Sequence, residues 1–194
     1  MKALVVIVAV VALLAALLVP QYNGLVKLDE AVNQSWSQVE NTYQRRADLI
    51  PNLVETVRGA ADFERETFEA VAEARARAGQ VSFDEAPDAG QLAQFQAAQG
   101  ELSSALSRLL VTVERYPELK ATEAFRDLQS QLEGTENRIA VERRRFTETA
   151  QEYNAQRRRF PTVLVAGLMG FEERAYFSAT EGADRPPEVD FREE

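Results

Sequence analysis

The side chains most capable of chemistry in this 194-residue chain are carboxylates. Carboxylate oxygens alone can bind Mg²⁺ or Ca²⁺, so a carboxylate-metal enzyme is one hypothesis. The acids near the first helical region are spread over several helix faces without the spacing of a ligand loop, and solvated acids are the default on a helix exterior. That hypothesis is therefore the weaker one, and no catalytic, cofactor or metal-binding residue is predicted. The acids concerned are Glu40, Asp48, Glu55, Asp62, Glu64 and Glu66.

The composition removes most other catalytic chemistry, because the chain has no histidine and no cysteine. Histidine is the commonest general base at neutral pH and a frequent metal ligand, and cysteine supplies thiolate nucleophiles and structural zinc sites. A Ser-His-Asp triad, a zincin helix and a Glu-x-x-His di-iron bundle are excluded. The formal net charge of −9 disfavours a nucleic-acid partner, since phosphates would be repelled. We expect a non-enzymatic protein without a small-molecule substrate.

The elements that carry these side chains are predicted to be helices. Hydrophobic residues make up 45% of the chain, which is enough for a core, while 9 glycines and 7 prolines are few for a turn-rich β protein. Alanine, glutamate, glutamine, arginine and leucine dominate, and all are strong helix formers.

Residues 3–19 carry only apolar side chains and read ALVVIVAVVALLAALLV. As a helix this run would span about 25 Å, close to the roughly 30 Å hydrocarbon layer of a bilayer. A cleaved secretory signal is the alternative, but the run is long for one and LLVPQYN offers no good cleavage site. A buried core helix would have a polar face, which this run lacks. We predict a membrane-spanning anchor with its interface over residues 1–24.

The orientation of the anchor depends on few charges. Lys2 and the terminal amine precede the apolar run, and Lys27 follows it beside Asp29 and Glu30. The positive-inside rule favours an amino terminus in the cytoplasm. The predicted location is the inner (cytoplasmic) membrane, as a single-pass protein with its body on the periplasmic side and the lipid bilayer as its first partner.

The predicted body, residues 25–160, shows apolar positions three or four residues apart in four segments, which indicates four helices. Pro51 lacks an N–H and disfavours helical geometry at Ile50, so one helix should end near residues 48–50 and another should begin at Pro51. So short a connection favours an antiparallel hairpin, and the alternative is one long helix kinked at Pro51. The predicted fold is all-α: an antiparallel up-and-down four-helix bundle preceded by one N-terminal transmembrane helix. The four segments are 25–49, 51–78, 88–116 and 119–159.

The apolar stripes predict the core and flag two acids. Glu64 and Glu142 fall at stripe positions, either in water at a helix flank or buried against an arginine as a register device. The candidate partners are Arg45, Arg46, Arg58 and Arg138. The aromatic residues of the stripes are predicted to be core residues rather than cofactor contacts: Trp36, Phe68, Phe95, Phe125 and Phe146.

An up-and-down bundle returns the end of the fourth helix to the membrane side, where the sequence reads RRRFPTVLVAGLMGF. The apolar run is too short to span a bilayer but can lie in its interface, while the arginines would approach anionic headgroups. The alternative is that residues 161–178 cap the bundle base. The polar segment 179–194 is predicted to be disordered. The predicted membrane contacts are Arg157, Arg158, Arg159, Phe160, Leu164, Leu168 and Phe171.

The stretch VENTYQRRADLIPNLVETV, within residues 22–59, resembles the signature region of the LemA family, and the similarity continues into FPTVLVAGLMGFEERAYF at residues 160–177. The resemblance implies a bacterial protein with one N-terminal membrane helix, a helical-bundle body and no catalytic residues. Family members often have a histidine where Phe63 stands, and a Tyr-Asn pair where this chain has Phe146 and Thr147. A role for that histidine cannot apply here.

The signature surrounds the predicted turn at Pro51, whose side chains could cap the two helix ends or present a recognition surface. The hypothesis for function is a membrane-anchored helical scaffold or interaction protein of the bacterial envelope. Its partners would be other envelope membrane proteins or further copies of the chain, and the alternative is a subunit of a larger membrane complex. The candidate recognition residues are Arg45, Arg46, Asp48, Pro51 and Asn52.

Overall fold

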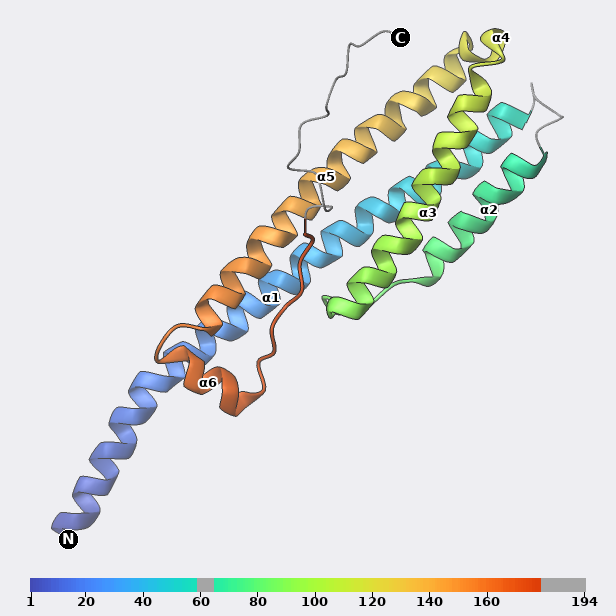
Figure 1. Ribbon diagram of the computed structural model, residues 1–194. Helices are drawn as coiled ribbons and strands as arrows, with labels where there is room; N and C mark the ends of the chain where they lie inside the picture. The colour runs from blue at the N-terminus through green and yellow to red at the C-terminus, as the bar shows by residue number, and fades with distance from the viewer. Residues whose placement is uncertain (59–64, 179–194) are drawn as a thin grey trace, which may run out of the picture.

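The computed structural model describes residues 1–58 and 65–178, and these residues form helices and connecting segments without a strand. Figure 1 shows an elongated, rod-like molecule with its amino terminus at one end. The helices are α1 (Lys2–Arg58), α2 (Arg65–Gln80), α3 (Ala89–Val113), α4 (Pro117–Lys120), α5 (Glu123–Arg157) and α6 (Thr162–Met169). The prediction of an all-helical chain is confirmed for the described residues.

The long helices lie side by side, α1 along α5 and α2 along α3 (Figure 1). In α1, Trp36 stacks edge-on against Phe146 of α5, and Arg46 pairs with Glu136 of α5. Rising numbers in α1 therefore meet falling numbers in α5, so these two helices run in opposite directions.

The helix end predicted near residues 48–50 was wrong, because α1 continues through Pro51 to Arg58. Proline has no N–H for the carbonyl four residues earlier, so the oxygen of Ala47 loses its helical partner. The guanidinium of Arg75, which α2 places against this turn, donates from Nε to that oxygen at 2.7 Å. An interhelical bond thus replaces the missing helical one and lets the helix run on. Residues 51–58, predicted to open the second helix, belong to α1.

This substitution of one bond for another predicts a coupling between Arg75 and Pro51. Arg75→Leu should lower the free energy of unfolding of the parent chain because it leaves the Ala47 carbonyl unpaired. The same substitution should lower it by about 1 kcal/mol less in a Pro51→Ala background, where residue 51 again has an N–H for that carbonyl. Thermal unfolding of both single variants and the double variant, followed by circular dichroism in detergent, gives the coupling. Strict additivity would show that the bond does not support the helix.

The other boundaries lie within a few residues of prediction. Asp88 begins α3 with a capping box, in which its side chain accepts from the Gln91 N–H and the Gln91 side chain accepts from the Asp88 N–H. Pro117 opens the short α4, and Thr122 caps α5. Gly170 ends α6 with φ = 76°, a left-handed conformation that favours glycine.

The core consists of two clusters stacked along the rod. The distal one contains Ile50, Leu102 and Leu132, and the one nearer the anchor contains Val39 and Tyr153. All five predicted core aromatics are buried, namely Trp36, Phe68, Phe95, Phe125 and Phe146.

The apolar start of α1 stands clear of the body (Figure 1). Leu4, Leu13 and Val19 are 68%, 62% and 54% exposed, which is unusual for such side chains in water. Within the described residues, α1 is the one helix long and apolar enough to cross a membrane.

Of the two acids at stripe positions, Glu64 and Glu142, the structure describes only Glu142. Glu142 is buried. Phe63, Glu64 and the tail 179–194 lie outside the described residues.

Candidate functional site

The predicted recognition residues do not surround a turn, because this stretch is helical. Arg46 points inward and is only 2% exposed. Its predicted companions lie on the outer surface of α1: Arg45, Asp48, Pro51 and Asn52 are all exposed. The structure therefore separates one buried arginine from a polar surface stripe.

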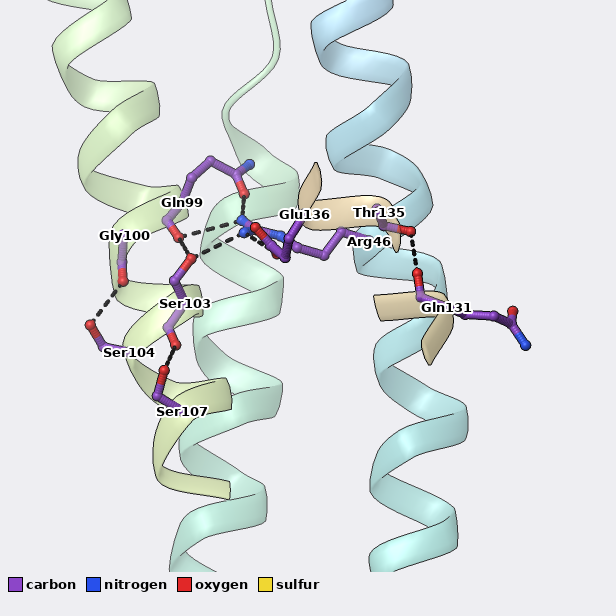
Figure 2. Close-up of polar contacts among 9 residues, drawn as sticks. All are labelled: Arg46, Gln99, Gly100, Ser103, Ser104, Ser107, Gln131, Thr135 and Glu136. Atoms are coloured by element: carbon purple, nitrogen blue, oxygen red, sulfur yellow. Dashed lines mark hydrogen bonds and ion pairs between the residues drawn. The ribbon is translucent and has the colours of Figure 1, made fainter. Parts of the chain in front are cut away.

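Arg46 crosses the centre of the body and joins three helices (Figure 2). Its Nη1 donates to Oγ of Ser103 on α3 and to Oε1 of Glu136 on α5, both at 3.0 Å. Its Nη2 donates to the side-chain and main-chain oxygens of Gln99 on α3. The guanidinium carbon also lies 4.9 Å from the centre of the Tyr43 ring, within cation–π range. We call Arg46, Gln99, Ser103 and Glu136 the arginine layer.

The arginine layer separates the two core clusters. On α1 the cluster nearer the anchor ends at Tyr43, and the distal one begins at Ile50. On α3 the same gap lies between Phe95 and Leu102. Because the donors and acceptors of the layer must meet, it fixes the register of α1, α3 and α5.

Helix α1 also holds the connection between α2 and α3. Oδ1 of Asn33 accepts from the Ala86 N–H at 3.1 Å, and Oε1 of Glu40 accepts from the Phe83 N–H at 3.1 Å. Burial raises the pKa of Glu40 above its ordinary value of 4.5. Because ionising a partly buried carboxyl costs free energy, Glu40 holds this loop at some expense of stability at neutral pH.

Glu40→Gln is expected to raise the unfolding midpoint at pH 7, because the amide keeps the acceptor for Phe83 without the charge. An acid whose pKa is raised in the folded state favours folding below its unfolded pKa, and that contribution is lost as pH rises through the folded value. The advantage of the variant should therefore shrink as pH falls from neutral toward 4.5, and it should be absent below that value. Thermal melts across this range check it, with the exposed Glu30→Gln as the control. A variant difference independent of pH would contradict it.

The base of the body is formed by α6 against α1. Val165 and Ala166 pack on α1, while Leu164 and Leu168 are 59% and 79% exposed. Between the helices lies an apolar groove of about 550 Å³. The groove is lined by Leu18, Val19 and Tyr22 of α1 and by Leu164, Val165, Leu168 and Met169 of α6.

A chain of polar contacts attaches the start of α6 to both long helices. Oγ1 of Thr162 donates to Oε1 of Gln21 at 2.8 Å and accepts from Nε2 of Gln156 at 3.4 Å. Gln156 also accepts from Nη1 of Arg159 at 3.2 Å. The base therefore has a polar attachment at the start of α6 and an apolar groove beside it.

The predicted membrane contacts are distributed over this base. Phe160 is 81% exposed, and Arg158 and Arg159 are exposed beside it. Arg157 instead pairs with Glu173 at 3.4 Å. Phe171 packs edge-on against Tyr22, with ring centres 5.7 Å apart.

After Gly170 the chain climbs back along the body (Figure 1), and we call residues 171–178 the strap. Asn154 of α5 pairs with the backbone of Arg174: its Nδ2 donates to the carbonyl at 2.7 Å and its Oδ1 accepts from the N–H at 3.0 Å. The Arg174 guanidinium forms a bidentate ion pair with Asp29 of α1: Nε donates to Oδ1 at 2.9 Å and Nη2 donates to Oδ2 at 3.1 Å. Phe177 then packs against Trp36 and Phe146. The strap is thus held by contacts with both α1 and α5.

Sequence reasoning missed the partners of Arg46 and the strap. A signal for the first existed, because Gln99 lies at a stripe position of the third predicted helix between Phe95 and Leu102. The strap has no periodic pattern from which it could be predicted. In the described residues, no group of three or more acids is placed to hold a metal ion.

Comparison with known proteins identifies relatives of this chain. Magnetosome protein MamQ 2 of Paramagnetospirillum magneticum is 27% identical over 199 residues, covering 93% of this chain and 72% of the relative. Magnetosome protein MamQ of Magnetospirillum gryphiswaldense is 26% identical, with the same coverage. Protein LemA of Metamycoplasma hominis is 21% identical over 82% of this chain and 69% of its own length. The family model described as LemA family matches residues 35–191, and the chain therefore belongs to the LemA family.

Proposed function

We propose that this protein is a non-enzymatic, membrane-anchored helical scaffold of the bacterial envelope. In this proposal the start of α1 crosses the inner membrane, and α1, α2, α3 and α5 form an antiparallel four-helix bundle on the periplasmic side. The exposed apolar segment, the buried core and the family membership support it.

The observation that carries the proposal is the continuity of α1. Its 57 residues run from the exposed apolar segment into the centre of the body, a length of about 86 Å. Beyond Pro51 the helix is supported by Arg75, and its register against α3 and α5 is held by Arg46. A body built on the same helix as its anchor is held at a fixed height above the bilayer, as a scaffold requires.

The surface proposed to meet a partner is the polar stripe of α1. Arg45, Asp48 and Asn52 are spaced by three and four residues, so they share one face of the helix and are exposed together. Such a stripe on a rigid support suits recognition of another envelope protein. A second copy of the chain, or a larger complex that contains it, is the alternative occupant.

A photo-cross-linking residue at position 45 tests both parts of the proposal in cells. We expect the protein in the membrane fraction after an alkaline wash, together with cross-linked species that a probe at the buried position 39 does not give. Mass spectrometry then distinguishes another envelope protein from a second copy. Recovery of the intact chain in the soluble fraction would reject the anchor, and an absence of adducts specific to position 45 would reject the stripe.

A further inference from the structure

We propose that the base of the body is an anionic phospholipid site. The groove between α1 and α6 takes an acyl chain, and Arg158 and Arg159 pair with the headgroup phosphate. This inference rests on the membrane-anchored function proposed above and adds which lipids contact the body and through which residues.

The apolar surface at the base is continuous with that of the anchor. Val19 is 54% exposed on α1 and lines the same groove as Leu168, which is 79% exposed on α6. An exposed apolar patch rimmed by polar residues marks a contact surface in a soluble protein. Here the patch begins where the segment apolar enough to cross a bilayer ends, so the occupant that both surfaces share is lipid.

The direction of α6 fits an interfacial helix. Figure 1 shows α6 lying crosswise to α1 at the level where the anchor leaves the body. If α1 spans the bilayer, a crosswise helix lies near the plane of its surface, with Leu164 and Leu168 turned away from the packed residues Val165 and Ala166. Amphipathic interfacial helices bury one apolar face in this way.

The charge at the start of α6 gives the site its headgroup preference. Arg158 and Arg159 are exposed and form no ion pair within the described residues, whereas the preceding Arg157 is bound to Glu173. Nε of Arg158 donates to the Asn154 carbonyl at 3.3 Å, and Nη1 of Arg159 donates to Oε1 of Gln156 at 3.2 Å. Both side chains are therefore held in place by hydrogen bonds to α5. Two arginines that have no acidic partner in the part of the chain that the structure describes select anionic rather than zwitterionic lipid, although the net charge of the chain is −9.

A spin label at position 168 tests the groove, because the chain contains no cysteine and Leu168→Cys gives a single attachment point. The full chain is placed in nanodiscs that contain phosphatidylglycerol, and collisions of the label with oxygen and with a water-soluble nickel chelate are compared. We expect position 168 to be accessible to oxygen and shielded from nickel, like Leu13→Cys in the anchor. The exposed position Val111→Cys on α3 should behave as water-facing.

The outcomes separate the two proposals. Lipid contact at position 13 with water contact at position 168 overturns the lipid site and leaves the anchor intact. Water contact at position 13 overturns the anchored function itself. Dipolar broadening between labels at position 168 would show a second copy on this face, which also overturns the lipid site.

Headgroup selection is tested on the full chain in detergent with equal phosphatidylglycerol and phosphatidylcholine, by counting bound lipids with native mass spectrometry. We expect enrichment of phosphatidylglycerol, reduced about fivefold or more by Arg158→Glu with Arg159→Glu. Arg144→Glu with Arg145→Glu makes the same charge change at exposed positions higher on α5 and should keep the enrichment. Equal binding of both lipids, or equal losses in both double variants, would overturn the role of the two arginines.

Discussion

Arg46→Ala is expected to lower the free energy of unfolding by about 3–5 kcal/mol, the usual cost of removing one partner from a buried charged network. Arg46 is 2% exposed, and its guanidinium donates to all three other members of the arginine layer. Without the guanidinium, the side-chain oxygen of Gln99, itself 8% exposed, is buried without its donor. A cavity between the two core clusters adds to the cost.

The measurement is thermal unfolding of the full chain in detergent, followed by circular dichroism and by the fluorescence of Trp36, the single tryptophan. Arg45→Ala is the matched control, because it removes the same side chain from an exposed neighbour and should change stability by less than about 0.5 kcal/mol. Glu136→Gln should also be mild, since Glu136 is 46% exposed and its ion pair is screened by water.

A second variant tests whether Arg46 acts through its polar partners or only through its volume. Arg46→Met keeps much of the volume and leaves Gln99 unpaired, so it should still be destabilising. Adding Gln99→Leu removes that unpaired group and should recover most of the loss, because apolar replacement of a whole buried polar set is often close to neutral. Equal stability of Arg46→Ala and the parent would show that the layer contributes nothing to folding.

The helical class and the core aromatics could be predicted because both follow from local pattern. Residues three or four positions apart share a helix face wherever the helix lies, so Trp36 and Phe146 were identified without knowledge of their partners. The start of α3 was predictable for a similar reason, since glycine, proline and acidic residues precede it.

The helix end at Pro51 could not be predicted correctly from the local rule alone. The rule weighs the lost N–H of proline but not a donor from another helix, and Arg75 lies on α2. One local signal pointed the other way, because the apolar spacing continues from Tyr43 through Arg46 and Ile50 to Leu53 without a change of phase. That phase places Arg46 in the core, although arginine is rarely buried unless it is paired.

The base of the body shows a different limit. The sequence identified both uses of residues 161–178, covering the core and facing the membrane, as alternatives. In the structure Val165 of α6 packs inward and covers the core, while Leu168 is exposed. Contact of that exposed face with a membrane stays a prediction. The strap that follows depends on Asn154 and Asp29, which are far away in the sequence and have no pattern in common with it.

Asn154→Leu is expected to release the strap from α5 and to destabilise its docking by about 2–4 kcal/mol. Leucine is close to asparagine in size but can neither donate to the Arg174 carbonyl nor accept from the Arg174 N–H, and each unpaired group costs about 1–3 kcal/mol. The loss is local, because the strap follows α6 and Phe177 is the one strap residue buried in a core cluster, with Phe171 and Ala175 packed against that cluster. Hydrogen exchange at the Arg174 amide should therefore accelerate by about 30-fold or more, while exchange in α3 stays unchanged.

Fluorescence gives a second readout of the same event. Phe177 covers Trp36 at a ring distance of 6.5 Å, so release of the strap should expose the indole to water and shift its emission to longer wavelength. Asn137→Leu makes the same substitution at an exposed position of α5 and should leave both signals at parent values. If Asn154→Leu keeps the Arg174 amide protected, the contacts of Phe177 and the Arg174–Asp29 pair hold the strap by themselves, and the side chain of Asn154 is not what attaches the strap to α5.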